Sequence, residues 1–111
     1  MPAMKTPIID REFSKFTEVN LSVFVHNILW RLLSHPDFPK PHPTLEEVRG
    51  KLGDLKRELN RLFGGDDGAL ETIRGTRSEL EEMMRTLADN LEATTQDREK
   101  LATTGFELLR E

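Results

Sequence analysis

Apolar residues recur at helical spacing in three stretches of the chain, and each stretch predicts one main helix. We expect the first helix to begin near Thr17, because a threonine at that position accepts a backbone hydrogen bond from the first turn. Phe16 and Leu21 then occupy the two positions of a hydrophobic staple. The helix must end before Pro36, which disfavours helical geometry in the residue before it. Its apolar positions are Leu21, Phe24, Val25, Ile28, Leu29, Leu32 and Leu33.

The second helix is predicted by an unbroken heptad seam that lies between a capping box and a pair of glycines. Thr44 and Glu47 have the spacing of the capping box, in which the threonine caps the helix and the glutamate lies three residues later. Gly64 and Gly65 end the helix, since glycine tolerates the left-handed turn that follows many helices. The seam consists of Leu45, Val48, Leu52, Leu55, Leu59 and Leu62.

A longer and less regular seam predicts the third helix, which we expect Asp66 or Asp67 to cap. If the helix is continuous to Thr95 it is ~43 Å long and extends beyond the second helix by about two turns. We expect the C-terminal segment to cover that overhang. The seam consists of Leu70, Ile73, Arg77, Leu80, Met84, Leu87, Leu91 and Thr94.

The segments outside these helices are short. Four prolines among the nine residues 35–43 predict a stiff extended connector, in which Phe38 is the one apolar side chain and is expected to close one end of the core. Residues 97–103 are expected to form a short helix, and Gly105 to turn the chain. For residues 8–16 the sequence leaves open whether they are helical.

These elements predict an all-α fold, namely an antiparallel up-and-down helical bundle of three main helices with short helical segments at the termini. We expect one domain, with residues 1–16 as an N-terminal segment and residues 17–111 as the bundle. A chain of 111 residues is the right size for a single core.

Two short motifs resemble a helical module of uncharacterised bacterial proteins, which often precedes a fibronectin type III domain. The motifs are the connector His35-Pro36-Asp37-Phe38-Pro39-Lys40-Pro41 and the later run Leu80…Leu87-Ala88-Asp89…Thr104-Gly105-Phe106. The resemblance covers about residues 16–106 and implies a helical bundle. It supplies no activity, because none is assigned to the family. It departs in two respects: the relatives have alanine-rich bundle helices, and, because this sequence ends at Glu111, we expect no fibronectin-like domain to follow.

Composition and charge exclude several classes of function. Charged residues make up 32% of the chain and its net charge is −4, with no basic patch, which argues against nucleic-acid binding. The absence of cysteine excludes disulfides and thiolate metal sites. The most apolar run, residues 21–33, is too short to span a membrane, and no signal peptide is evident. We therefore expect a cytoplasmic or particle-associated protein.

Candidate residues for catalysis are sparse. His35 and His42 lie seven residues apart on the connector, without the spacing of a helical metal pair, and His26 belongs to an apolar helix. Glu79, Glu81 and Glu82 favour a solvated helix face. We expect no enzyme activity, metal, cofactor or small-molecule substrate; a metal protein using His35 and His42 is the least favoured reading.

The first helix carries apolar side chains beyond its main stripe, and two explanations remain open. Either the helix is buried on nearly all sides, or its extra side chains form a contact patch. Such a patch predicts a non-catalytic assembly or protein–protein interaction module that binds a protein partner or forms a homo-oligomer. The alternative is a structural component of a large particle, such as a phage virion or a secretion apparatus, whose ends order only on assembly. The candidate patch is Phe13, Phe16, Val23, Trp30, Phe106 and Leu109.

Overall fold

The computed structural model describes residues 7–110, and within them the chain is all-α, as predicted. No strand occurs in this range; the one extended pairing is an isolated antiparallel bridge between Ile9 and Leu108. The elements are a 3-10 turn η1 (Phe13–Lys15) and the helices α1 (Glu18–Leu32), α2 (Leu45–Phe63), α3 (Ala69–Thr94) and α4 (Arg98–Ala102).

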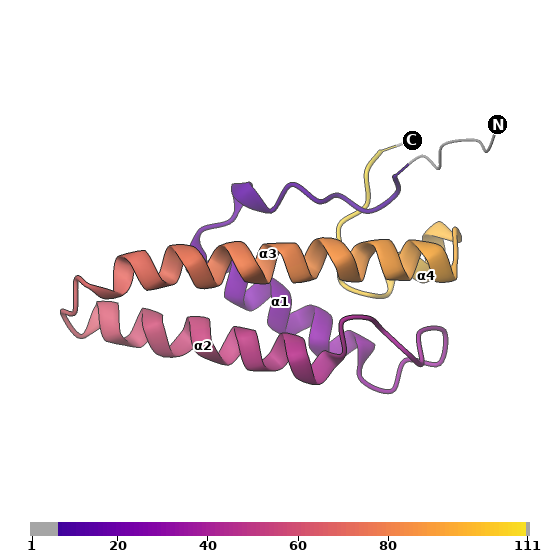
Figure 1. Cartoon of the computed structure of the whole chain (residues 1–111). Coiled ribbons are helices and arrows are strands. Elements are labelled where there is room, and N and C mark those ends of the chain that lie inside the picture. Colours follow the sequence, from indigo (N-terminus) through magenta and orange to yellow (C-terminus); the bar gives the residue numbers. More distant parts are fainter. Residues whose placement is uncertain (1–6, 111) are drawn as a thin grey trace.

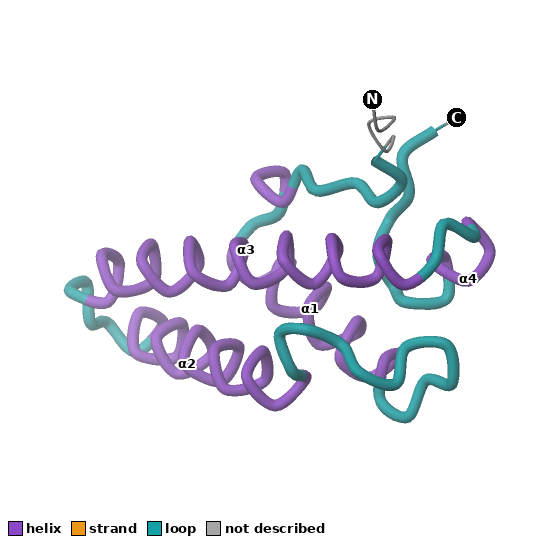
Figure 2. Tube along the Cα trace, turned by 45° about the vertical axis from the view of Figure 1, so that its right-hand side comes forward, coloured by secondary structure: helices purple, strands orange, loops and turns teal. Residues whose placement is uncertain are grey.

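Helices α2 and α3 lie side by side and antiparallel, joined by a tight turn, and α1 crosses them obliquely (Figures 1 and 2). Helix α3 has 26 residues and α2 has 19, so α3 extends beyond α2 by roughly two turns, about 10 Å. The overhang predicted from the two seams is therefore present. The short α4 follows at that end of α3, as expected.

The predicted caps of α1 and α2 are confirmed. Thr17 Oγ1 accepts the backbone N–H of Asn20 at 3.1 Å, and Thr44 Oγ1 accepts that of Glu47 at 3.1 Å. The predicted cap of α3 is wrong, because the helix begins one residue after Gly68. Asp66 instead accepts the N–H of Gly68 at 3.1 Å, which closes the turn before the helix.

The core is built from the predicted seams, with three corrections. Thr94, the last residue of the predicted α3 seam, is exposed, and its hydroxyl donates to the backbone oxygen of Asn90. Leu33, the C-cap residue of α1, is exposed because it follows Trp30 by three residues and lies on the same side of the helix as that exposed side chain. Leu70 is also exposed, and the small Ala69 takes the inward position in the first turn of α3. Phe38 is buried from the connector as predicted.

Both ends of the described chain pack against the bundle. The N-terminal segment, residues 7–16, is extended apart from η1 and runs along α3, with Ile9 and Phe13 buried (Figure 1). Two backbone hydrogen bonds join it to the C-terminal segment: Asp10 N–H to Glu107 O at 2.9 Å, and Leu109 N–H to Ile8 O at 2.7 Å. The N-terminal segment thus shares one core with the bundle and covers α3 together with the C-terminal segment.

Candidate interaction surface

One face of α1 carries exposed side chains along its whole length, and all of them but His26 are apolar. Val23 is 64% exposed, Trp30 is 72% exposed and Leu33 is 53% exposed. They belong to a series spaced by four and three residues in alternation, which is the spacing of a coiled-coil seam. We call this series the α1 stripe; it consists of Val19, Val23, His26, Trp30 and Leu33.

A groove of about 340 Å³ lies between the second half of α1 and the first half of α2. Its apolar lining comes from Leu29 and Leu52, next to Trp30 and Leu33 of the α1 stripe. Gly53 keeps the groove open on the α2 side, where a Cβ would meet no atom closer than 3.8 Å. The α1–α2 groove is lined by His26, Leu29, Trp30, Leu33, Arg49, Leu52, Gly53 and Lys56.

Two exposed cations, Arg49 and Lys56, border this groove from α2. Within residues 7–110 neither has a carboxylate oxygen within 4.0 Å of its charged nitrogens. The next residue after Lys56, Arg57, is by contrast paired with Asp54. The rim of the groove therefore carries positive charge that the described part of the chain leaves uncompensated.

The predicted patch residues do not form one surface. Val23 and Trp30 are exposed on α1, as the contact-patch explanation requires, and burial of α1 on nearly all sides is therefore wrong. Phe13 and Phe106 belong to the core and are 1% and 3% exposed. Leu109 is 39% exposed in the C-terminal segment, outside the groove.

The two buried phenylalanines are explained by an aromatic cluster that joins the chain ends to α1. The Phe24 ring lies 6.0 Å from that of Phe13 and 5.8 Å from that of Phe106, the latter edge to face. The half-buried Phe16 stacks on Phe24 at 4.7 Å. Contacts at these separations are favourable geometries for aromatic pairs, so these rings stabilise the attachment of both ends.

Several residues of the surface were not predicted as site residues. Val19 and His26 complete the α1 stripe, and their heptad spacing to Trp30 is a signal that the sequence contains. Arg49, Gly53 and Lys56 share one face of α2 at the same spacing. Their relation to α1 depends on how the two helices pack, which their spacing does not reveal.

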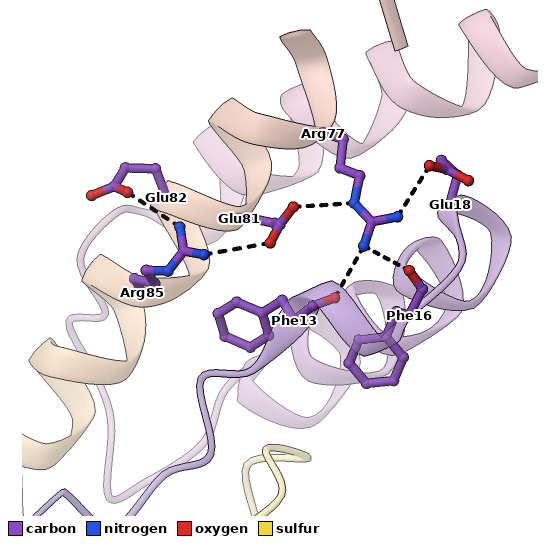
Figure 3. A network of polar contacts seen from close by, with 7 residues as sticks. All are labelled: Phe13, Phe16, Glu18, Arg77, Glu81, Glu82 and Arg85. Carbon is purple, nitrogen blue, oxygen red and sulfur yellow. Dashed lines mark hydrogen bonds and ion pairs between the residues drawn. The ribbon is translucent and has the colours of Figure 1, made fainter. Parts of the chain in front are cut away.

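The most connected polar cluster holds the N-terminal segment on α3 and is shown in Figure 3. Arg77 donates to the backbone oxygens of Phe13 at 3.0 Å and Phe16 at 2.6 Å. Its guanidinium also contacts Glu81 at 3.1 Å and Glu18 at 3.2 Å. All four partners of Arg77 belong to the same chain, so the cluster has a structural role. These contacts also explain why an arginine occupies a position in the α3 seam where an apolar residue is usual.

A second polar cluster centres on the buried Glu92. Its Oε2 accepts the backbone N–H groups of Ile8 at 3.0 Å and Ile9 at 2.7 Å, and Arg11 at 3.0 Å. Burial alone raises the pKa of Glu92, but these hydrogen bonds to its charged form outweigh it, so the pKa lies below the usual range. This carboxylate anchors the N-terminal segment near the overhanging end of α3.

The ring of His35 is engaged in the fold, whereas His42 donates its backbone N–H to Asn90 Oδ1 at 3.0 Å. His35 Nδ1 accepts the Asp37 backbone N–H at 3.1 Å, so Nε2 carries the proton and donates it to Thr103 Oγ1 at 2.8 Å. Neither ring nitrogen of His35 is left over for a metal. Across residues 7–110 no cluster of three or more metal-ligating side chains occurs. Nor is any helix in that range long and apolar enough to cross a membrane.

Comparison of the chain with protein-family models, curated proteins and solved structures finds no match. The resemblance to the bacterial helical module stays a prediction that rests on the connector and the Gly105-Phe106 turn.

Proposed function

We propose that this protein is a non-catalytic interaction module that docks onto another protein through the α1 stripe. The observation that carries the proposal is the exposure of Trp30 within an apolar row of coiled-coil spacing. A tryptophan exposes a large apolar area to water and is enriched among the residues that dominate binding energy. A single exposed apolar residue would need no explanation, but a continuous row at an unpartnered helix face does.

The geometry of α1 also supports docking of a helix. The stripe runs from Val19 to Leu33, which corresponds to ~21 Å of helix. That length suits a partner helix of four turns, the usual scale of helix-in-groove recognition. The alternative, a component of a large particle, finds less support. It predicts ends that order only on assembly, whereas residues 7–16 and 106–110 pack on the bundle within the single chain.

Site-specific photo-crosslinking in living cells tests this proposal. A photoreactive phenylalanine analogue is placed at Val23 or Trp30, and at Phe63 as the control. Phe63 is 70% exposed, as much as Trp30, but lies at the far end of α2 and outside the groove. We expect one discrete adduct of the same mass from Val23 and Trp30, and none from Phe63.

Two outcomes would overturn the proposal. One is the absence of adducts from Val23 and Trp30 in cells where the chain is present and folded. The other is the same diffuse set of adducts from all three positions, which would indicate random collisions. An adduct of twice the chain's mass would support docking with the second copy as the partner.

A further inference from the structure

Resting on the proposed function, we infer that the α1–α2 groove receives an acidic amphipathic helix from a different protein. Its apolar side chains would pack along the α1 stripe, and its carboxylates would face Arg49 and Lys56.

The positive charge at the groove favours a partner that carries negative charge. His26, Arg49 and Lys56 are the titratable residues that line it, and no carboxylate lines it within residues 7–110. This occurs in a chain whose net charge is −4. Partner carboxylates opposite Arg49 and Lys56 would meet cations that have no internal counter-ion, and the pairing would lose no existing salt bridge.

The same charges disfavour a second copy of this chain as the occupant. A twofold contact applies the same patch to itself, so a dimer centred on the groove would place the two cationic rims against each other. Like charges that face each other across an interface are destabilising. A partner with acidic flanks removes this repulsion.

The shape of the groove favours a helix over a flat surface. Gly53 lies on the groove face of α2 between Arg49 and Lys56, one helical turn from each. The missing side chain there leaves room for another backbone to approach. The apolar lining lies between the two helices, with Trp30 and Leu33 on the α1 side and Leu52 on the α2 side. A rod-like apolar face fits this recess.

Trp30 provides a direct reporter, because it is the only tryptophan of the chain and there is no tyrosine. The probe is a displayed library of tryptophan-free helical peptides of about four turns, with apolar residues fixed at heptad core positions and the flanking positions randomised. Selected peptides are synthesised and titrated against the full chain while Trp30 emission is recorded. We expect enrichment of Asp and Glu at the flanks, a blue shift of the emission, and weaker binding at high salt.

A charge-reversal series tests the role of the two cations. The variant Arg49→Glu/Lys56→Glu should bind the selected acidic peptides at least about tenfold more weakly. It should regain affinity for the same peptides with Lys in place of Glu. The control Arg74→Glu/Arg110→Glu makes the same change in net charge at exposed positions outside the groove and should bind as the unaltered chain does. Helical circular dichroism confirms that each variant is folded.

Several results would overturn the inference. These are no binders from the library, selected flanks without acidic enrichment, or equal affinity in the groove and control variants. Trp30 emission that shifts with anionic phospholipid vesicles but with no peptide would assign the surface to membranes. A concentration-dependent dimer that shifts the emission without peptide would assign it to a second copy. If the inference fails while crosslinks from Trp30 are found, the docking function stands and only the acidic partner is refuted.

Discussion

Replacement of Arg77 by methionine should destabilise the fold strongly, although the side chain lies in a helix seam where an apolar residue is usual. The guanidinium is 14% exposed and donates to the backbone oxygens of Phe13 and Phe16. Methionine keeps the aliphatic stem, but the Phe16 carbonyl loses its donor. The Phe13 carbonyl then keeps only the backbone N–H of Phe16, and the half-buried Glu81 keeps only Arg85. The extended N-terminal segment would then keep its attachment at Glu92 but lose the one at Arg77.

The size of the effect follows from these contacts. A hydrogen bond from a charged donor contributes about 1.5–3 kcal/mol. The two carbonyl contacts would then sum to about 3–6 kcal/mol if no water replaced them. Water reaches part of the site, and the contact with the more exposed Glu18 adds little. We expect Arg77→Met to lower the free energy of unfolding by about 2–4 kcal/mol, a large share of the total for a chain of this size.

Urea unfolding followed by helical circular dichroism measures this difference, with the slope m confirming that the unfolded state is unchanged. The matched control is Arg85→Met on the same helix. Arg85 is 43% exposed and pairs with Glu81 and Glu82, so its loss should cost less than about 1 kcal/mol. If the two variants were equally stable, Arg77 would not be the attachment point that the contacts indicate.

Further predictions concern the Glu92 anchor, two glycines and the cap of α2. The lowered pKa of Glu92 means that its stabilising contribution is complete above its usual value of 4.5 and is lost as the pH falls below it. When the free energy of unfolding is measured at decreasing pH, the variant Glu92→Gln should therefore lose less stability than the unaltered chain. An identical pH dependence in the two proteins would contradict the role of Glu92 as an anchor. In Gly105→Ala, the new Cβ would lie 2.9 Å from Asn27 Nδ2 at a backbone φ of 95°, so thermal unfolding should show a loss of about 1–3 kcal/mol. Gly75 lies in mid-helix with open space around it, so Gly75→Ala should instead raise the free energy of unfolding by about 0.5–1 kcal/mol. A loss of stability in both glycine variants would contradict this difference between the two sites. Thr44→Ala should cost about 1 kcal/mol in urea unfolding through the lost cap of α2, and no change would show that the cap is dispensable.

The parts of the fold that sequence alone predicted depend on local interactions. The caps at Thr17 and Thr44 and the seam of α2 involve residues within one or two turns of each other, so their spacing is sufficient to place them. The errors occur where a helix ends. Leu33 is the C-cap residue of α1 and lies on the side of Trp30, and at the start of α3 the inward position belongs to Ala69.

The candidate surface was predictable only in part, for the same reason. The exposure of Val23 and Trp30 follows from their position off the main stripe of α1. The burial of Phe13 and Phe106 depends on contacts between the two ends of the chain and Phe24, at sequence separations that no periodicity encodes. The cationic rim formed by α2 likewise depends on the packing of two helices.

Oxidative footprinting of Trp30 in cells, compared with the purified chain, tests the central claim most directly. Hydroxyl radicals modify exposed side chains, and Trp30 and Phe63 are 72% and 70% exposed in the single chain. For each residue, the extent of modification in the cell is divided by that in the purified protein. If the α1 stripe is a docking surface, this ratio falls for Trp30 and stays near its free value for Phe63. Equal ratios for the two residues would show that Trp30 remains uncovered in the cell and would contradict the proposed function.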